Sequence, residues 1–237
     1  MPTAAKIPYD DALRERISAR LVRYPRRVAP LEGRKAAAVA IVLVDSQVGE
    51  GPINPVDGPP GIGPVLGSLL RDVSGGAAFL LTVRAGRLRA HGGQYALPGG
   101  RVDPGETTIE AALRELDEEV GMQLGAEAVL GCLDDYPTRS GYVMTPVVLW
   151  GGGPGEVRPA AQEVLAAHRI GLGQLTRADS PQFYSIPESE RPVVQLPLGA
   201  EVLHAPTAAV LLQLRWWGLE GRHDPVEGFE QPVFAWH

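Results

Sequence analysis

The strongest constraint on the fold is an acidic amphipathic helix that the sequence predicts over residues 106–120. Thr107 and Glu110 form a T-x-x-E capping box at its start, and Gly121 stands just past its end, where a left-handed residue closes a helix. Its apolar residues cluster on one stripe of the helical wheel, formed by Ile109, Ala112, Leu113, Leu116 and Val120. Because this stripe has to be buried, the rest of the chain must supply a surface that covers it.

Three carboxylates leave the same helix on another side. Glu115, Glu118 and Glu119 fall within an arc of about 100° away from the apolar stripe, so they project toward a common point. The ordinary interpretation is an acidic helix face in contact with solvent. The acids of such a face are normally paired with Lys or Arg four residues away, but here only Arg114 offers a nearby positive charge. Acids near the end of a helix also oppose its dipole. The arrangement costs stability, which favours a bound divalent cation as its explanation.

Apolar runs elsewhere in the chain predict the sheet that this helix covers. Buried strands are expected over residues 37–44, 78–83, 129–133, 142–150 and 164–170. Further helices are expected over residues 9–23 and 206–219. Strands and helices that alternate irregularly, with no internal repeat, indicate an α/β chain whose mixed sheet carries helices on both faces.

The termini and one long loop lie outside this core pattern. We expect residues 1–35 to form an N-terminal helical extension packed on a domain of residues 36–237, with a Gly- and Pro-rich insertion at 47–76 that holds at most one short helical turn. The tail VFAWH has strand character and suits a sheet edge. Trp216 and Trp217 are adjacent on the last helix and are not expected to face one core together, so one of them is a candidate subunit contact.

Composition disfavours several classes of function. The net charge of −6 argues against a nucleic-acid coat protein, which needs a basic face. A single cysteine, Cys132, cannot form a disulfide framework within the chain. No apolar stretch reaches the roughly 18 to 20 residues of a membrane span, and the N-terminus lacks the apolar core of a secretory signal. We therefore expect a cytoplasmic protein without a nucleic-acid or membrane partner.

The acids of the helix belong to a longer pattern, G-x5-E-x7-R-E-U-x-E-E-x-G-U, in which U is apolar. Every specified position is met, by Gly100, Glu106, Arg114, Glu115, Leu116, Glu118, Glu119, Gly121 and Met122. This segment resembles the Nudix box, the defining motif of the Nudix hydrolase family. The resemblance implies a Nudix fold, which is an α/β/α sandwich around a mixed β-sheet, and a metal-dependent hydrolase that cuts a diphosphate linkage.

The resemblance also implies roles for the matching residues. The expected ligands of Mg²⁺ or Mn²⁺, which prefer oxygen donors, are the carbonyl of Gly100 and the carboxylates of Glu115, Glu118 and Glu119. Arg114 would orient Glu115, and Glu106 would brace the loop or contribute through water. The general base would be Glu115 or an acid outside the motif, for which Glu163 is a candidate, although an ordinary surface glutamate is the alternative there.

A second pattern narrows the range of expected substrates. Several residues before the acidic helix resemble the signature of the coenzyme A diphosphatase subfamily, namely Leu80 to Arg84, Ala85, Arg89, Gly93 and Leu97 to Gly100. Leu97 departs from the usual Phe, and Gly86 stands near a usual Ser. The likeness continues outside the signature and covers most of residues 13–215 except the insertion.

The subfamily likeness implies cleavage of coenzyme A or acyl-coenzyme A to adenosine 3′,5′-bisphosphate and (acyl-)4′-phosphopantetheine. Arg84 and Arg89 are the expected substrate-binding residues. Arg87 and Arg101 also lie close to the approach to the metal-binding loop, where guanidinium groups can bind phosphates in bidentate fashion. The alternatives are hydrolysis of another nucleoside diphosphate derivative, such as ADP-ribose, a dinucleotide or a dinucleoside polyphosphate, and nucleotide sensing without catalysis. Because many Nudix proteins are dimers, a homodimer is also expected.

Overall fold

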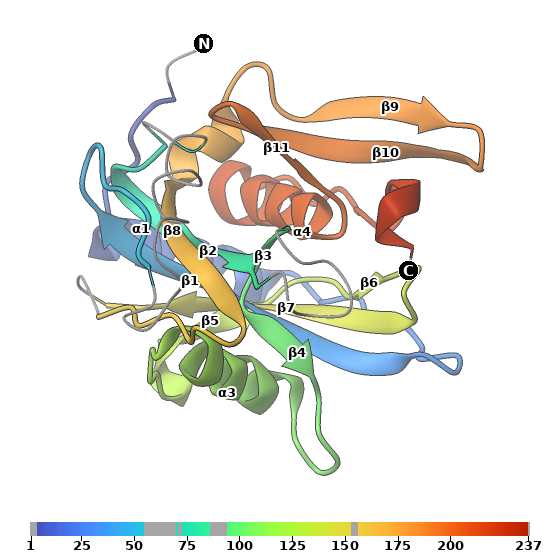
Figure 1. Cartoon of the computed structure of the whole chain (residues 1–237), viewed down its shortest axis with the longest axis horizontal. Helices are drawn as coiled ribbons and strands as arrows, with labels where there is room; N and C mark the ends of the chain where they lie inside the picture. Colours follow the sequence, from blue (N-terminus) through green and yellow to red (C-terminus); the bar gives the residue numbers. More distant parts are fainter. Residues whose placement is uncertain (1–3, 55–69, 71–72, 86–93, 153–155, 237) are drawn as a thin grey trace.

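The centre of the protein is a mixed sheet. The computed structural model describes residues 4–54, 70, 73–85, 94–152 and 156–236 (Figure 1). The sheet has eight strands: β1 (Lys35–Ser46), β2 (Gly76–Arg84), β3 (Tyr95–Ala96), β4 (Gly99–Arg101), β5 (Val129–Cys132), β6 (Tyr136–Pro137), β7 (Tyr142–Trp150) and β8 (Val164–Gly171). β1 and β7 pair in parallel, and the other pairs in this sheet are antiparallel. The expected mixed sheet is confirmed.

Strand β1 shows why this sheet is buried on both faces. It lies between β2 and β7, and its successive side chains enter two different cores. One core contains Ala38, Ala40 and Val42, and the other contains Val39, Ile41 and Leu43. A strand that is covered on both faces needs a continuous apolar run, which is the pattern that the sequence shows.

Helices cover the two faces (Figure 1). α3 (Thr108–Val120) packs Ala112, Leu116 and Val120 against the first core, while α1 (Asp11–Arg23) and α4 (Thr207–Leu214) pack against the second. The capping box of α3 is present, since the Thr107 hydroxyl accepts from the Glu110 N–H at 3.2 Å and Glu110 Oε2 accepts from the Thr107 N–H at 2.7 Å. The result is the expected α/β/α sandwich.

The two adjacent tryptophans correct one expectation. α4 continues into a π-helical turn, η3 (Arg215–Glu220), and both Trp216 and Trp217 are buried, at 6% and 1% exposure. The wider turn reduces the angle between successive side chains, so both rings reach the same core, although each has its own ring partners. The Trp216 ring lies 6.0 Å from Phe229, and the Trp217 ring lies 4.2 Å from Tyr24. The sequence argument for a Trp subunit contact was therefore wrong.

A second, three-stranded antiparallel sheet was not anticipated. It consists of β9 (Gln182–Ile186), β10 (Ser189–Leu198) and β11 (Glu201–His204), and it lies over α4 (Figure 1). The remaining short elements are the 3₁₀ turns η1 (Ala126–Ala128), η2 (Leu172–Thr176) and η4 (Val233–Ala235). The prediction of a strand in the tail was wrong, because Val233–Ala235 forms the turn η4. The Trp236 indole N–H donates to the Gln231 carbonyl at 2.9 Å.

The insertion forms the connection between β1 and β2. Its first part is tied to the sheet by Ile53, which forms a bridge with Ala167, and by an ion pair of 2.5 Å between Glu50 and Arg169. The helical turn expected in its middle falls almost wholly outside the described residues. The division of the chain near residue 35 stays a prediction, and α1 shares a core with the central sheet. Within the described ranges, no helix combines the length and the apolar character that crossing a membrane requires.

Candidate functional site

Strand β4 brings the chain backbone against an acid of α3. Its pairing with β1 sets Gly100 opposite Ala38, on the face that α3 covers. A Cβ atom at Gly100 would overlap the carboxylate of Glu115. Only glycine therefore permits this close approach of the Glu115 side chain to the loop backbone. The two residues, which are 15 positions apart, are in direct contact.

Arg114 is shared by three carboxylates. Its Nε and Nη2 donate to Glu106 at 2.9 and 3.1 Å, and its Nη1 donates to Glu115 at 2.8 Å and to Glu118 at 3.0 Å. Nη2 also donates to the carbonyl of Arg101 at 3.0 Å, which fixes the end of β4. The hydrogen bonds from Arg114 hold the pKa of Glu106 below its usual value, and Glu106 and Glu115 raise the pKa of Arg114. One guanidinium thus orders the start of α3, its middle and the preceding loop.

Glu119 is the most deeply placed acid of the group, at 5% exposure. Burial, together with the negative charges of Glu115 and Glu163, raises its pKa to about 8 against the positive charge of Arg84. Burial also raises the pKa of Glu115, although Arg114 opposes that shift. Carboxylates that are disfavoured by burial and by one another are stabilised in their charged form by a nearby cation.

Arg84, the last residue of β2, and Glu163, the residue before β8, lie at the edge of the acidic group formed by Glu106, Glu115, Glu118 and Glu119. Arg84 ends β2 and is paired with Val164 at the start of β8, and the Ala85 N–H donates to the Glu163 carbonyl at 2.8 Å. Both side chains act electrostatically on Glu119. The structure therefore brings the expected substrate-binding Arg84 and the candidate base Glu163 to the acids of α3. Arg89, the other expected substrate-binding residue, lies outside the described residues, as does Arg87.

The segment before β8 is a supporting element that the sequence analysis missed. The Arg158 N–H donates to the Val120 carbonyl at 2.7 Å, and the Ala160 N–H donates to the Glu119 carbonyl at 2.9 Å. These bonds satisfy carbonyl groups at the C-terminal end of α3 that have no partner within the helix. Because they use backbone groups only, no residue type signals them.

The donor set has the chemistry that a hard divalent cation requires, namely several carboxylates and a backbone carbonyl. As the side chains stand, no three His, Cys, Asp or Glu residues of the described ranges are grouped closely enough to hold one metal ion. Arg114 engages one oxygen of Glu115 and one of Glu118, whose side chain is 55% exposed. A cation at this place therefore requires these two carboxylates to turn toward the buried Glu119.

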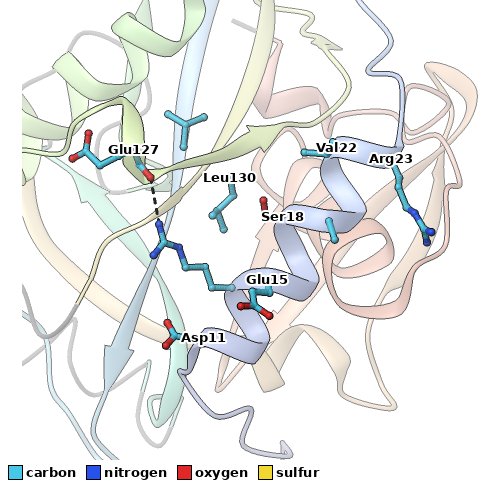
Figure 2. Close-up of a pocket in the computed structure, with 10 residues that line it drawn as sticks. Asp11, Glu15, Ser18, Val22, Arg23, Glu127 and Leu130 are labelled. Atoms are coloured by element: carbon cyan, nitrogen blue, oxygen red, sulfur yellow. Dashed lines mark hydrogen bonds between the residues drawn. The ribbon is translucent and has the colours of Figure 1, made fainter.

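A separate open groove of about 740 Å³ lies between α1 and the η1–β5 segment (Figure 2). Its lining consists of Asp11, Arg14, Glu15, Ser18, Ala19, Val22, Arg23, Glu127, Val129 and Leu130. None of the residues expected in the site belongs to this set, and its charges of both signs are spread along an exposed helix face. The acids of α3 remain the candidate functional site.

Parts of this sequence match a known domain family and known proteins. The NUDIX domain matches residues 63–187, which is more than half of the 237 residues. A Yersinia enterocolitica protein named "Uncharacterized Nudix hydrolase NudL" is 49% identical over 71 residues, covering 30% of this chain and 36% of that protein. Nudix hydrolase 3 of Caenorhabditis elegans is 44% identical over 77 residues, covering 32% of each chain. The matched segment thus spans about a third of each relative's length.

Solved structures give a more distant likeness. A MutT/nudix family protein from Enterococcus faecalis aligns over 88% of this chain and 73% of its own, at 14% sequence identity and a TM-score of 0.47. The family assignment follows from the domain match, which includes the whole segment from Gly100 to Met122 together with β2, β7 and β8. This chain belongs to the Nudix family.

Proposed function

We propose that this protein is a metal-dependent hydrolase that cleaves the diphosphate linkage of coenzyme A or acyl-coenzyme A. The products would be adenosine 3′,5′-bisphosphate and 4′-phosphopantetheine or its acyl form. The observation that carries the proposal is the burial of Glu119 at 5% exposure, with Glu115, Glu163 and Arg84 close enough to act on its charge. The choice of coenzyme A rests on the likeness of residues 80–100 to the subfamily signature.

The proposed cation ligands are the carbonyl of Gly100 and the carboxylates of Glu115, Glu118 and Glu119. Mg²⁺ or Mn²⁺, when bound, neutralises phosphoryl oxygens and lowers the pKa of a bound water. Arg114 keeps Glu106 in place through two hydrogen bonds, which orders the loop before the substrate arrives, and it engages only one of the two oxygens of Glu115.

Two acids are candidates for the proton acceptor. Glu115 is half-buried with a raised pKa, and Glu163 is close enough for its charge to raise the pKa of both Glu115 and Glu119. Either would take the proton of the attacking water. Arg84, together with Arg89, would bind phosphate oxygens of the substrate, because a guanidinium can bind two of them at once.

The direct test is product analysis after incubation with coenzyme A and either Mg²⁺ or Mn²⁺. We expect equal amounts of adenosine 3′,5′-bisphosphate and 4′-phosphopantetheine, and none when the metal is chelated. Steady-state kinetics on coenzyme A, its 3′-dephospho form and ADP-ribose complete the test. Preference for ADP-ribose, with no gain from the 3′-phosphate, would reject coenzyme A as the substrate.

The second candidate function is hydrolysis of another nucleoside diphosphate derivative, such as ADP-ribose, a dinucleotide or a dinucleoside polyphosphate. The observation that favours it is Leu97, which stands where the coenzyme A signature usually has Phe. Nucleotide sensing without catalysis is the third candidate. It would be supported by nucleotide binding with Mg²⁺ and no turnover across all these substrates.

A cytoplasmic homodimer is part of the proposal and rests on the family likeness. With both Trp216 and Trp217 buried, no residue pair is assigned to the subunit contact. Sedimentation of the purified chain over a range of concentrations would test the dimer.

A further inference from the structure

Arg101 differs from most arginines of this protein in its partners. Arg114, Arg139 and Arg177, among others, form ion pairs with carboxylates. Arg101 forms none within the described ranges. Its Nε donates to the hydroxyl of Tyr142 at 3.0 Å, and its guanidinium carbon lies 5.7 Å from the centre of the Tyr142 ring. The two terminal nitrogens of Arg101 are therefore left without a protein acceptor among the described residues.

The side chain of Arg101 lies on the face of the sheet that is turned away from α3. Its neighbour Gly100 points to α3, and successive residues of a strand point to opposite faces. Arg101 is paired with Ala37 of β1, and Tyr142 of β7 is paired with Lys35, two residues before Ala37 and hence on the same face. The guanidinium thus reaches from β4 to β7 across the small side chain of Ala37.

Both ends of this contact are anchored. The carbonyl of Arg101 accepts from Arg114, so the backbone of Arg101 is joined to the acidic group on the other face. The N–H of Tyr142 donates to the Thr138 hydroxyl at 3.0 Å, and its carbonyl accepts from the Thr138 N–H at 2.7 Å. A guanidinium whose Nε is held in this way has less freedom to lose when its terminal nitrogens bind a ligand.

A second cation, Lys35, lies near Arg101. Lys35 is exposed on the same face of the neighbouring strand, and no ion pair joins it to a carboxylate within the described ranges. A planar cation whose two terminal nitrogens have no acceptor among the described residues, with a second cation nearby, suits a phosphate monoester. The oxygens of a phosphate monoester accept in bidentate fashion, and the group approaches two negative charges.

We propose that Arg101, oriented by Tyr142, binds a phosphate group of the substrate that is not cleaved, and that this contact selects nucleotides carrying a phosphate monoester away from the diphosphate. The inference rests on the proposed function and deepens it, since the 3′-phosphate of coenzyme A is such a group. The acidic group of α3 on one face and Arg101 on the other would then act on different phosphates of one molecule.

The test compares coenzyme A with 3′-dephospho-coenzyme A. For the wild type we expect a higher kcat/KM on coenzyme A, and for Arg101→Met a fall in the ratio of the two values of about tenfold or more, because a charge-assisted contact is lost. Tyr142→Phe keeps the cation but removes its anchor, so a smaller fall in the same ratio is expected. The matched control is Arg23→Met, since Arg23 projects from the exposed end of α1 (Figure 2) and should leave the ratio as in the wild type.

A binding measurement separates this inference from the proposed reaction. Calorimetric titration with adenosine 3′,5′-bisphosphate and with adenosine 5′-monophosphate, in the presence of a chelator, needs no turnover. Tighter binding of the bisphosphate that Arg101→Met abolishes supports the inference even if coenzyme A is not cleaved. Cleavage of coenzyme A with no preference for the 3′-phosphate, or with a preference that Arg101→Met leaves intact, would overturn the inference alone.

Discussion

Two buried acids of this protein, Glu119 and Glu230, stand in opposite surroundings. Glu119 forms no ion pair in the described part of the chain, and its three acidic neighbours on α3 and the loop share Arg114. Glu230 is fully buried but accepts from two arginines, with Arg139 Nη2 at 2.5 Å and Arg191 Nη2 at 2.9 Å. Burial acts to raise both pKa values. The arginines and the Gln231 N–H outweigh it at Glu230, whose pKa lies well below its usual value, whereas the pKa of Glu119 rises to about 8.

The difference teaches that burial of an acid does not by itself mark a functional site. Around Glu230 positive charge is in surplus, and the group ties the C-terminal segment to the core, with the Arg139 guanidinium 4.9 Å above the Trp236 ring. Around Glu119 positive charge is deficient, so the charged acids destabilise the folded protein unless a cation from solution binds beside them. The residues around Glu230 therefore have a structural role, and those around Glu119 form the candidate metal site.

The largest expected effect is on turnover in Glu119→Gln. We expect kcat to fall by roughly two or more powers of ten, with substrate affinity much less affected, because loss of a metal ligand acts mainly on the charge of the transition state. Steady-state kinetics with saturating Mg²⁺ or Mn²⁺ would measure it. Glu127→Gln, a change at an exposed acid beyond the end of α3, is the control. Near-wild-type turnover in Glu119→Gln would contradict the assigned site.

Glu230→Gln should instead act on stability. We expect the free energy of unfolding to fall by about 2 to 3 kcal/mol, because Arg139 and Arg191 lose the charge that they share. Urea unfolding followed by fluorescence would measure the change. The control is Glu227→Gln, since Glu227 is exposed and its loss should change the unfolding free energy by less than about 0.5 kcal/mol. If Glu230→Gln stayed folded with unchanged stability but lost turnover, Glu230 would have a functional role and not the structural role assigned to it.

A smaller effect should appear in the pH dependence of stability. The pKa of Glu119 is raised from 4.5 to about 8 in the folded state, so the folded protein binds this proton more tightly than the unfolded chain. Stability is therefore lost as the pH rises from about 4.5 to about 8. In metal-free protein, Glu119→Gln should be more stable than the wild type by about 1 kcal/mol or more at pH 8 and similar to it near pH 4.5.

For Glu230 the sign is opposite. Its pKa is lowered in the folded state, so its contribution is present above the ordinary value of 4.5 and is lost as the pH falls below it. The penalty of Glu230→Gln should therefore shrink in acid. Urea unfolding with a chelator present would compare them, with Glu119→Gln measured at pH 8 and near pH 4.5, and Glu230→Gln measured at pH 8 and at about pH 3. Penalties of the same sign and the same pH trend would show that the two acids do not differ as described.

The two regions also differ in how far the sequence could predict them. Every signal for α3 is local: the capping box at Thr107, the apolar stripe and Gly121 lie within 15 residues, and Gly121 adopts the expected left-handed conformation with φ of 67°. The contact between Gly100 and Glu115 lies within the same motif. By contrast, Glu230 is an acid in a polar tail whose partners stand 91 and 39 residues away. Nothing in the local sequence separates it from a solvated glutamate.

The second sheet escaped prediction for a related reason. β9 is largely exposed, and β10 contains Arg191, Pro192 and Pro197, so neither strand shows a clean apolar or alternating pattern. The edge of the acidic group was partly predictable. Arg84 and Glu163 could each be singled out as candidates, but their closeness to Glu119 depends on the pairing of β2 with β8 across 79 residues of chain.

The most direct test of the central claim is Mn²⁺ binding measured by electron paramagnetic resonance, in which free Mn²⁺ is counted during a titration without any nucleotide. A charge deficit around Glu119 predicts that the wild type and Glu230→Gln bind the ion alike, while Glu119→Gln binds it at least about tenfold more weakly. Equal Mn²⁺ affinity in the wild type and Glu119→Gln, or no binding by the wild type, would contradict the claim that these acids form a cation site.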